Sequence, residues 1–238
     1  MSQVIAVLGV GPGLGLSIAH RFGREGFTTA LVSRTDARHA TYRASLAEAG
    51  ITAHTYAADV TDEAQLGAVL DRIRTDAGEI DTVYYGPADQ GVGAAMAPLP
   101  EAGVDNLRVP FEALVLPAAQ LTQAVLPRMR DRGAGSLLFA GGLSGKYPMP
   151  LLGSFAPASA ALRMYVLTLN EALRDTGVYA GALTIGGLIK GGDIHRVFTE
   201  QDHGFTAGTL DPDDIAERAW SLHVERDEAE AEFIGVTA

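Results

Sequence analysis

The feature that most constrains the fold is a strict alternation of short β-branched runs with longer segments of helical periodicity. In the first third of the chain the runs lie at residues 4–10, 28–33 and 51–58, and the helical segments lie at 14–25, 37–49 and 62–76. Alternation of strand and helix requires crossover connections, which are right-handed and produce a parallel sheet with helices on both faces. The pattern therefore predicts a doubly wound, Rossmann-type α/β fold.

The same alternation continues to the end of the sequence. Further strands are expected at 81–86, 135–141, 178–185 and 231–236, and further helices at 111–129, 156–174 and 212–225. Pro117 inside the first of these helices is expected to kink or interrupt it. At 238 residues the chain is long enough for one substantial core. We expect a single domain over residues 1–238, with about seven strands in the order 3-2-1-4-5-6-7.

The composition excludes several classes of function. The formal net charge is −11, with 29 acidic against 18 basic residues, so neither nucleic acid nor an anionic membrane is an expected partner. There is no cysteine, which removes thiolate nucleophiles and disulfides. The apolar opening lacks the basic start of a signal peptide, and no uninterrupted apolar stretch approaches the roughly 20 residues of a spanning helix. We expect a soluble, cytoplasmic protein.

A glycine-rich loop, "LGVGPGLG" at residues 8–15, joins the first strand to the first helix. Gly9, Gly13 and Gly15 suit a tight turn in which the backbone approaches a pyrophosphate, and Leu14 lies between the last two. Free N–H groups at the helix N-terminus would then face the phosphates. The loop predicts dinucleotide binding, with an ordinary structural turn as the alternative.

The end of the second strand indicates which dinucleotide is preferred. An NAD site usually has a carboxylate there for the ribose 2′-hydroxyl, whereas an NADP site has arginine for the 2′-phosphate. Ser33 occupies the acidic position and Arg34 follows it. NADP(H) is therefore favoured over NAD(H); the alternative is that Arg34 only faces solvent while Asp36 caps the next helix.

Over nearly its whole length the sequence resembles the short-chain dehydrogenase/reductase family. The glycine-rich loop matches the family's T-G-x-x-x-G-x-G with Leu8 in place of threonine, and Asp59-Val60 matches its adenine-contacting pair. "YGPA", residues 85–88, replaces the family's Asn-Asn-Ala-Gly and places Gly86 in the cofactor site. The resemblance implies the same fold, and adds Gly186 and Ile189 to the expected cofactor contacts.

The same alignment removes the family's catalytic tetrad. Gly142 stands at the serine, Phe155 at the tyrosine, Ser159 at the lysine and Leu114 at the asparagine. In the family the tyrosine hydroxyl moves the substrate proton, and the adjacent ammonium lowers a phenol pKa that is otherwise about 10. General acid–base assistance is worth about 10²- to 10⁴-fold, so ordinary carbonyl reduction through these positions would be severely impaired.

Other residues are therefore candidates for the chemistry. Tyr85 is the first candidate proton donor, with a packed core tyrosine as the alternative; Lys146 and Tyr147 could supply a cation and a phenol. Ser144 lies in the same loop. Lys190 could contact cofactor phosphates, and His195 lies in an expected substrate lid at residues 187–208; surface positions are the alternative for both.

Three functions remain open at this point. The first is a divergent NADP(H)-dependent oxidoreductase acting on a small organic molecule. The second is a redox-neutral cyclase, isomerase or dehydratase that reuses the pocket, and the third is a non-catalytic NADP(H)-responsive binding protein. No metal site is expected, because no histidine pair has zinc spacing. The family resemblance implies a homodimer or homotetramer packed through the helices at 111–129 and 156–174.

Overall fold

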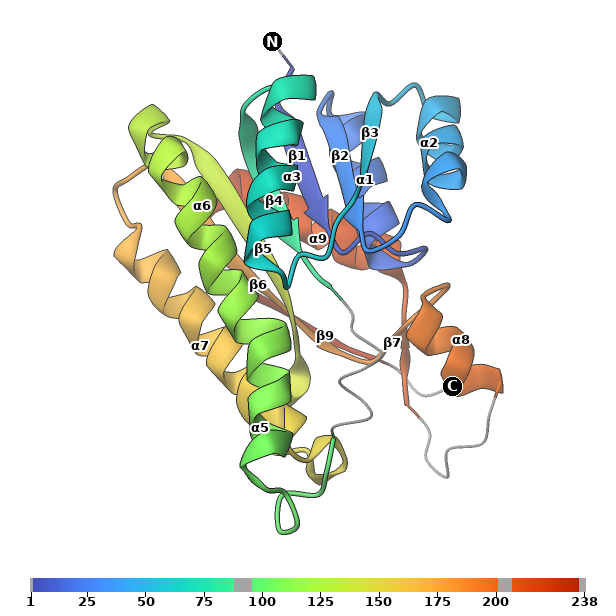
Figure 1. Ribbon diagram of the computed structural model, residues 1–238, viewed down its shortest axis with the longest axis vertical. Coiled ribbons are helices and arrows are strands. Elements are labelled where there is room, and N and C mark those ends of the chain that lie inside the picture. The colour runs from blue at the N-terminus through green and yellow to red at the C-terminus, as the bar shows by residue number, and fades with distance from the viewer. Residues whose placement is uncertain (1, 88–95, 201–206, 236–238) are drawn as a thin grey trace.

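The computed structural model describes residues 2–87, 96–200 and 207–235. Its centre is a parallel sheet in the order β3-β2-β1-β4-β5-β6-β9, which confirms the predicted strand order with β9 in the seventh place (Figure 1). The strands are β1 (Val4–Leu8), β2 (Thr28–Ser33), β3 (Ala53–Ala57), β4 (Ile80–Tyr85), β5 (Gly135–Gly142), β6 (Val178–Gly186) and β9 (Glu230–Ile234).

Helices cover both faces of the sheet and create two apolar layers. One layer joins the sheet to α3, α6 and α7, and the other joins it to α1, α2 and α9. Adjacent strand residues point to opposite faces, so Tyr84 and Tyr85 are both buried but lie in different layers. The helices are α1 (Leu14–Arg24), α2 (His39–Glu48), α3 (Glu63–Asp76), α5 (Val104–Pro110), α6 (Leu116–Arg132), α7 (Phe155–Ala172), α8 (Asp193–Glu200) and α9 (Pro212–Glu225).

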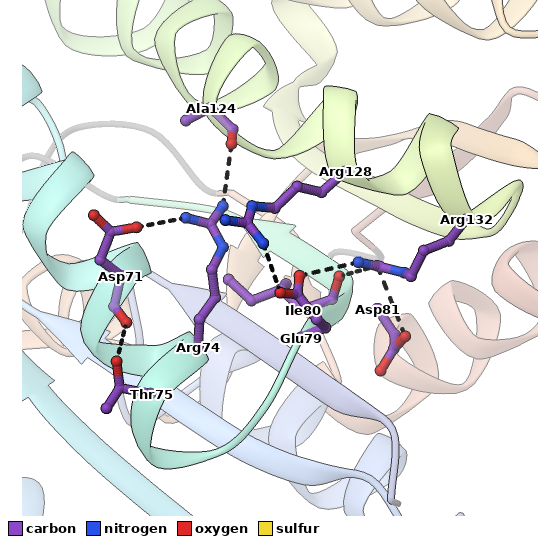
Figure 2. Close-up of polar contacts among 9 residues, drawn as sticks. All are labelled: Asp71, Arg74, Thr75, Glu79, Ile80, Asp81, Ala124, Arg128 and Arg132. Atoms are coloured by element: carbon purple, nitrogen blue, oxygen red, sulfur yellow. Dashed lines mark hydrogen bonds and ion pairs between the residues drawn. The ribbon is translucent and has the colours of Figure 1, made fainter.

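Three arginines fix α6 to the start of β4 and to α3 (Figure 2). Arg74 of α3 donates to the Ala124 carbonyl at 3.1 Å, and Arg132 donates to the Ile80 carbonyl at 2.8 Å. Arg128 and Arg132 share the carboxylate of Glu79, with N–O distances of 2.8 and 3.1 Å. These bonds set the position of α6 along the sheet.

The helix from Val104 to Arg132 is continuous but changes its winding in the middle. Residues Phe111–Val115 form a π turn, in which the Leu116 N–H donates to the Phe111 carbonyl. Pro117 has no N–H to donate and is the second residue of α6, just after this turn. The expected disturbance is thus a π turn inside an unbroken helix.

This helix is also long and apolar enough, by length and composition, to cross a membrane. About a third of its apolar window, 33%, is buried inside the structure, and its α6 portion packs on α3, β4 and β5. Core helices of water-soluble proteins meet the same criterion, so the helix is weak evidence for a membrane.

A small two-stranded ribbon projects from the carboxyl end of the sheet. Its strands, β7 (Leu188–Ile189) and β8 (Thr209–Leu210), pair in parallel on either side of α8 in the sequence. Three glycines lie at its base: a Cβ at Gly187 would come within 2.7 Å of the Gly208 carbonyl oxygen, and a Cβ at Gly208 would overlap Gly235. Glycine lets these three backbone segments cross in direct contact.

Near the amino end of β5, a half-buried histidine packs among aromatic rings. His223 of α9 packs against Phe22, Phe27 and Trp220, with ring centroids 5.2–5.7 Å away. Its Nδ1 lies 2.9 Å from the Ser136 hydroxyl oxygen. Burial, and secondarily the charge of Arg226, lowers the pKa of His223 to about 4.

We predict that His223 makes folding stability depend on pH. The unfolded chain takes up this proton near the ordinary histidine pKa of about 6.5, whereas the folded protein resists it down to about 4. The stability provided by the neutral ring is complete above the unfolded pKa and is lost as pH falls through this window. In His223→Gln, the loss of unfolding free energy between about pH 7 and pH 5 should be smaller by about 2 kcal/mol.

Urea denaturation at the two pH values measures this difference. Carboxylates also titrate toward pH 5. The quantity to compare between wild type and variant is therefore the loss of unfolding free energy between the two pH values. An equal pH dependence in the two proteins would show that His223 contributes nothing to it.

Candidate functional site

The sequence-predicted site residues gather at one edge of the sheet. Parallel strands bring their carboxyl ends to the same side, where open α/β sheets bind ligands. The register pairs Ser33 with Ala57, Gly142 with Ile185 and Gly186 with Ile234. Gly86 follows β4 and donates its N–H to the Leu8 carbonyl at 2.9 Å. The expected cofactor positions and the expected reaction centre therefore belong to one continuous edge.

The glycine-rich loop needs its glycines for two kinds of reason. Gly9 has φ +92° and a Cβ there would lie 2.6 Å from the Pro87 Cα, so both conformation and space exclude a side chain. A Cβ at Gly15 would lie 2.9 Å from the Val10 Cα. Helix α1 begins after Gly13 without a side-chain cap and with no acidic residue in its first turn. Its N-terminus therefore keeps the positive end of the helix dipole for an anion.

The segment after β6 forms the opposite wall of this loop. A Cβ at Gly13 would lie 3.1 Å from Ile189 Cγ2 and 3.2 Å from the backbone of Gly192. Ile189 was expected in the cofactor site from the resemblance, and it does lie beside the phosphate loop. Gly13, Leu14 and the 189–192 segment thus face one another across the start of α1.

The end of β2 carries hydroxyl and cationic groups where an NAD site carries a carboxylate. Ser33 Oγ donates to the Thr35 carbonyl at 2.9 Å and lies 2.8 Å from His39 Nε2, which is placed to donate to it. Burial lowers the pKa of His39, which favours its neutral form. Arg34 is exposed beside this position. Residue 33 is a serine, so it carries no carboxylate that would repel the 2′-phosphate of a dinucleotide.

Asp59 follows β3 at the same edge. Its carboxylate accepts from the Thr61 hydroxyl at 2.7 Å and the Thr61 N–H at 2.9 Å, and these bonds lower its pKa. Val60 beside it is buried. The turn is therefore rigid, and the Asp59-Val60 pair keeps the place that the resemblance gives to the adenine contact.

Taken together, these residues fit a dinucleotide with a 2′-phosphate. The uncapped start of α1 suits a pyrophosphate, and Gly9 and Gly13 let the loop pack closely against Pro87 and Gly192. Ser33 and Arg34 suit the phosphorylated ribose. The expected cofactor positions thus lie at one edge of the sheet, and their role in binding stays a prediction.

Three of the four positions that align with the catalytic tetrad meet in space. A Cβ at Gly142 would lie 3.4 Å from Ser159 Oγ and 3.8 Å from Phe155 Cε1. Leu114 lies in the π turn, and this turn packs against α7. The side chains at these four positions carry no ionisable group.

Tyr85, the first candidate donor, is a core residue. Its ring packs against Phe139 with centroids 5.9 Å apart, in the layer with α3 and α6. Burial and the charge of Asp59 raise its pKa, which disfavours loss of the proton. Its hydroxyl has no hydrogen-bond partner in the described part of the chain. A catalytic role for Tyr85 stays a prediction, and the packed alternative accounts for its burial.

Lys146 and Tyr147 do contact each other, but as a cation over a ring. Lys146 Nζ lies 5.5 Å from the Tyr147 ring centroid and forms an ion pair with Glu232 of β9. This pairing raises the pKa of Lys146, so the ammonium is stabilised in its charged form. Both side chains are exposed. Their proposed catalytic role also stays a prediction.

Lys190 and His195 lie on the segment that was expected to form a lid. Lys190 is exposed, and its N–H donates to the Leu210 carbonyl at 2.9 Å, which continues the β7–β8 pairing. His195 is half-buried on α8. Among residues 2–87, 96–200 and 207–235, no group of three histidine, aspartate or glutamate side chains is arranged to hold a metal.

Two contacts around the site were not anticipated from the sequence. Arg38 forms a two-pronged ion pair with Asp193, the first residue of α8, with N–O distances of 2.6 and 2.9 Å. Ser154 donates its N–H to the Ala97 carbonyl at 2.9 Å, and its Oγ accepts from the Ala97 N–H at 3.1 Å. Both contacts join distant segments of sequence, so no local motif indicates them.

Comparisons with known proteins agree with this geometry. Residues 3–195 match the family model described as short chain dehydrogenase. The ketoacyl reductase HetN of Nostoc sp. is 27% identical over 176 residues, which are 74% of this chain and 60% of that protein. The chain thus spans less than two thirds of that relative. The NADP-dependent 3-hydroxy acid dehydrogenase YdfG of Salmonella typhi is 25% identical over 224 residues, 92% of this chain and 88% of that protein.

Solved structures share the fold at low sequence identity. A variant of actinorhodin polyketide ketoreductase with NADPH has a TM-score of 0.86 at 20% identity, covering 98% of this chain and 96% of its own. A metagenomic short-chain oxidoreductase in complex with NADP has a TM-score of 0.79 at 19% identity, covering 99% and 98%. At these identities the likeness shows the fold alone.

We predict that the Arg38–Asp193 pair holds α8 against the β2–α2 connection. Asp193→Asn should speed amide hydrogen exchange in residues 193–200 while changing the global unfolding free energy by less than about 1 kcal/mol, because exposed ion pairs contribute little to it. Hydrogen exchange with mass spectrometry measures residues 193–200 and the rest of the chain in one experiment. Asp105→Asn, which removes the partner of Arg108 on α5, is a matched control. Unchanged exchange over 193–200 would contradict the prediction.

Proposed function

Because the chain belongs to the short-chain dehydrogenase family, we propose that it is an NADP(H)-dependent oxidoreductase acting on a small organic substrate. It would work without the family's tyrosine–lysine acid and base. The observation that carries the proposal is the arrangement of the expected cofactor positions: the uncapped start of α1 and the Ser33-Arg34 pair share one sheet edge with Gly142, and Ser159 of α7 lies beside Gly142.

NADPH, when bound, supplies a hydride. The protein's own part is to hold the phosphates at α1, orient the substrate near Gly142 and exclude water with the segment after β6. With Phe155 and Ser159 at the tyrosine and lysine positions, these positions provide no proton at neutral pH. The proposal therefore favours substrates that need little acid assistance, such as iminium ions or activated alkenes. The segment at 187–208 is the proposed lid, and the proposed substrate of the protein is a small molecule.

A redox-neutral reaction is the second candidate. The observation that favours it is the lack of ionisable side chains at the four tetrad positions, where Ser159 carries the one polar side chain. A cyclase, isomerase or dehydratase can work by shape and a few polar contacts. Conversion of a substrate with no net change in nicotinamide absorbance would favour this candidate, whereas cofactor binding with no conversion of any compound would favour a binding protein.

We predict that NADPH binds and that Arg34 gives it preference over NADH. Charge-assisted hydrogen bonds contribute about 1.5–3 kcal/mol, so Arg34→Ala should weaken NADPH binding by about 10- to 100-fold and leave NADH binding nearly unchanged. Titration followed by nicotinamide fluorescence measures both dissociation constants. Arg43→Ala on α2 removes an exposed arginine away from the strand end and is the matched control.

The outcomes of this titration separate the candidates. Absence of binding to either cofactor would remove the oxidoreductase proposal. If NADPH binds, single-turnover oxidation against a panel of carbonyls, imines and enones is the next measurement, with Tyr85→Phe compared to wild type. A large rate loss in that variant would assign Tyr85 the proton transfer despite its burial.

We also propose that the protein is a homodimer or homotetramer and is cytoplasmic. Apolar side chains are exposed on the helices that the family uses to pack subunits: Met164 of α7 is 57% exposed and Leu116 of α6 is 52% exposed. Exposed apolar patches of this kind are typical of interaction surfaces. Figure 1 shows α6 and α7 on the same side of the sheet.

We predict that Met164→Glu dissociates the oligomer. A charge on this face must be desolvated on association, so the variant should shift toward monomer by at least about tenfold in dissociation constant. Light scattering coupled to size exclusion measures the mass at several concentrations. Val224→Glu, on an equally exposed apolar residue of α9, is the control. A monomeric wild type, or an oligomer unaffected by Met164→Glu, would contradict the prediction.

A further inference from the structure

Two serine hydroxyls beside the tetrad positions are buried without partners. Ser144 is 6% exposed and Ser159 is 1% exposed. Within the described part of the chain, neither Oγ has a hydrogen-bond partner. Buried polar groups in folded proteins are nearly always hydrogen-bonded, because an unsatisfied group costs free energy. The presence of two such groups side by side requires an explanation.

Ser159 does not use the bond that a helical hydroxyl normally makes. Hydroxyls on other helices of this protein donate to the carbonyl four residues earlier: Thr122 to Ala118 at 2.8 Å, and Thr75 to Asp71 at 3.0 Å. Ser159 Oγ makes no such bond to its own helix. Its hydroxyl instead lies beside the position of the absent Gly142 side chain.

Two glycines, Gly145 and Gly186, allow the turn that carries Ser144 to pack close to Ser159. Residues Leu143–Gly145 form a 3-10 turn after β5. A Cβ at Gly145 would lie 2.6 Å from the Ser159 carbonyl oxygen, so only glycine lets this turn rest on the α7 backbone. A Cβ at Gly186 would overlap the Leu143 side chain. The turn is thus held from both ends, and this fixes Ser144 against α7.

Both hydroxyls border the space that the missing Gly142 side chain leaves. A Cβ built on Gly142 would lie 3.4 Å from Ser144 Oγ and 3.4 Å from Ser159 Oγ. An O–H···O bond is about 2.7–2.8 Å long, so an oxygen atom needs to lie only somewhat nearer the hydroxyls than that Cβ. Phe155 Cε1, 3.8 Å from the same point, forms an apolar side of the space.

We propose that Ser144 and Ser159 form a two-donor site for a single oxygen atom of the substrate, in the space left by Gly142. The substrate class is a compound with a carbonyl or enolate oxygen that gains negative charge during the reaction. Two preorganised O–H donors stabilise such charge without transferring a proton. The inference deepens the proposed function and rests on it for the nature of the substrate.

A high-resolution crystal structure of the full chain is the first test. We expect an ordered oxygen atom, water in the absence of substrate, within hydrogen-bond distance of both Ser144 Oγ and Ser159 Oγ. In Gly142→Ala the new methyl group should displace it; the backbone at Gly142, with φ −94° and ψ 148°, accommodates alanine. Hydroxyls bonded to each other, or a dry space between them, would overturn the proposal.

Matched probes test the preference for a substrate oxygen over a structural water. Cyclopentanone and methylenecyclopentane differ only in an oxygen atom replaced by CH₂. Ligand-observed NMR should give tighter binding of the ketone, and Ser144→Ala or Ser159→Ala should each reduce that preference by about two- to tenfold. Equal affinity for the two probes in wild type would indicate a structural water only and would overturn the substrate role.

Stability separates a role in binding from a role in folding. A hydroxyl whose only partner is a water contributes little to folding, so Ser144→Ala and Ser159→Ala should leave Tm unchanged or raise it. Ser136→Ala is the matched control: Ser136 is fully buried on β5, the strand that ends at Gly142, but its Oγ is bonded to His223. That variant should lower Tm. A similar fall in all three variants would show that the site hydroxyls are structural.

Measurements with and without NADP⁺ distinguish this inference from the proposed function. If NADP⁺ does not bind but the serine-dependent ketone preference is present, the oxygen site stands and the cofactor proposal fails. If NADP⁺ binds and the ketone preference is absent, the cofactor proposal stands and the oxygen site fails.

Discussion

The parallel register brings the ends of all neighbouring strands to one edge, and the turns that leave them crowd each other there. Glycine relieves this crowding. A Cβ at Gly9 would approach Pro87 to 2.6 Å, and one at Gly15 would approach Val10 to 2.9 Å. The same residues leave N–H groups uncovered at the start of α1. Close packing of the strand ends and an uncapped helix N-terminus, which suits an anion, therefore have one physical origin in this protein.

The sequence predicted the parts of the structure whose signal is local. Strand order followed from alternation of hydrophobic patterns, and the tight turn before α1 followed from glycine spacing over eight positions, residues 8–15. Contacts between distant segments could not be predicted in this way. Arg38 and Asp193 are 155 residues apart, and Lys146 and Glu232 are 86 apart. The π turn at 111–115 was missed too, because Pro117 indicates a disturbed helix but not its form.

The proposed reaction centre buries neutral hydroxyl groups where nearby positions hold charges. Arg163 of α7 and Glu230 of β9, for example, are half-buried and paired at 2.6 Å. At the proposed centre, Ser144 and Ser159 are neutral hydroxyls with no hydrogen-bond partner in the part of the chain that the structure describes. A neutral pair costs less to desolvate than an ammonium and keeps the same protonation state across physiological pH. Any pH dependence of chemistry here would then come from the substrate itself.

The three glycines at the base of the β7–β8 ribbon have a consequence for how such a protein diversifies. Gly187 and Gly208 bring the two ends of the intervening segment side by side, and Gly235 joins them to the last strand. A segment whose ends already meet can be replaced or lengthened at little cost in loop-closure entropy and without altering the register of the sheet. The residues between these glycines, which include the proposed lid, can therefore change in length and sequence over evolutionary time while the strand register of the sheet stays constant.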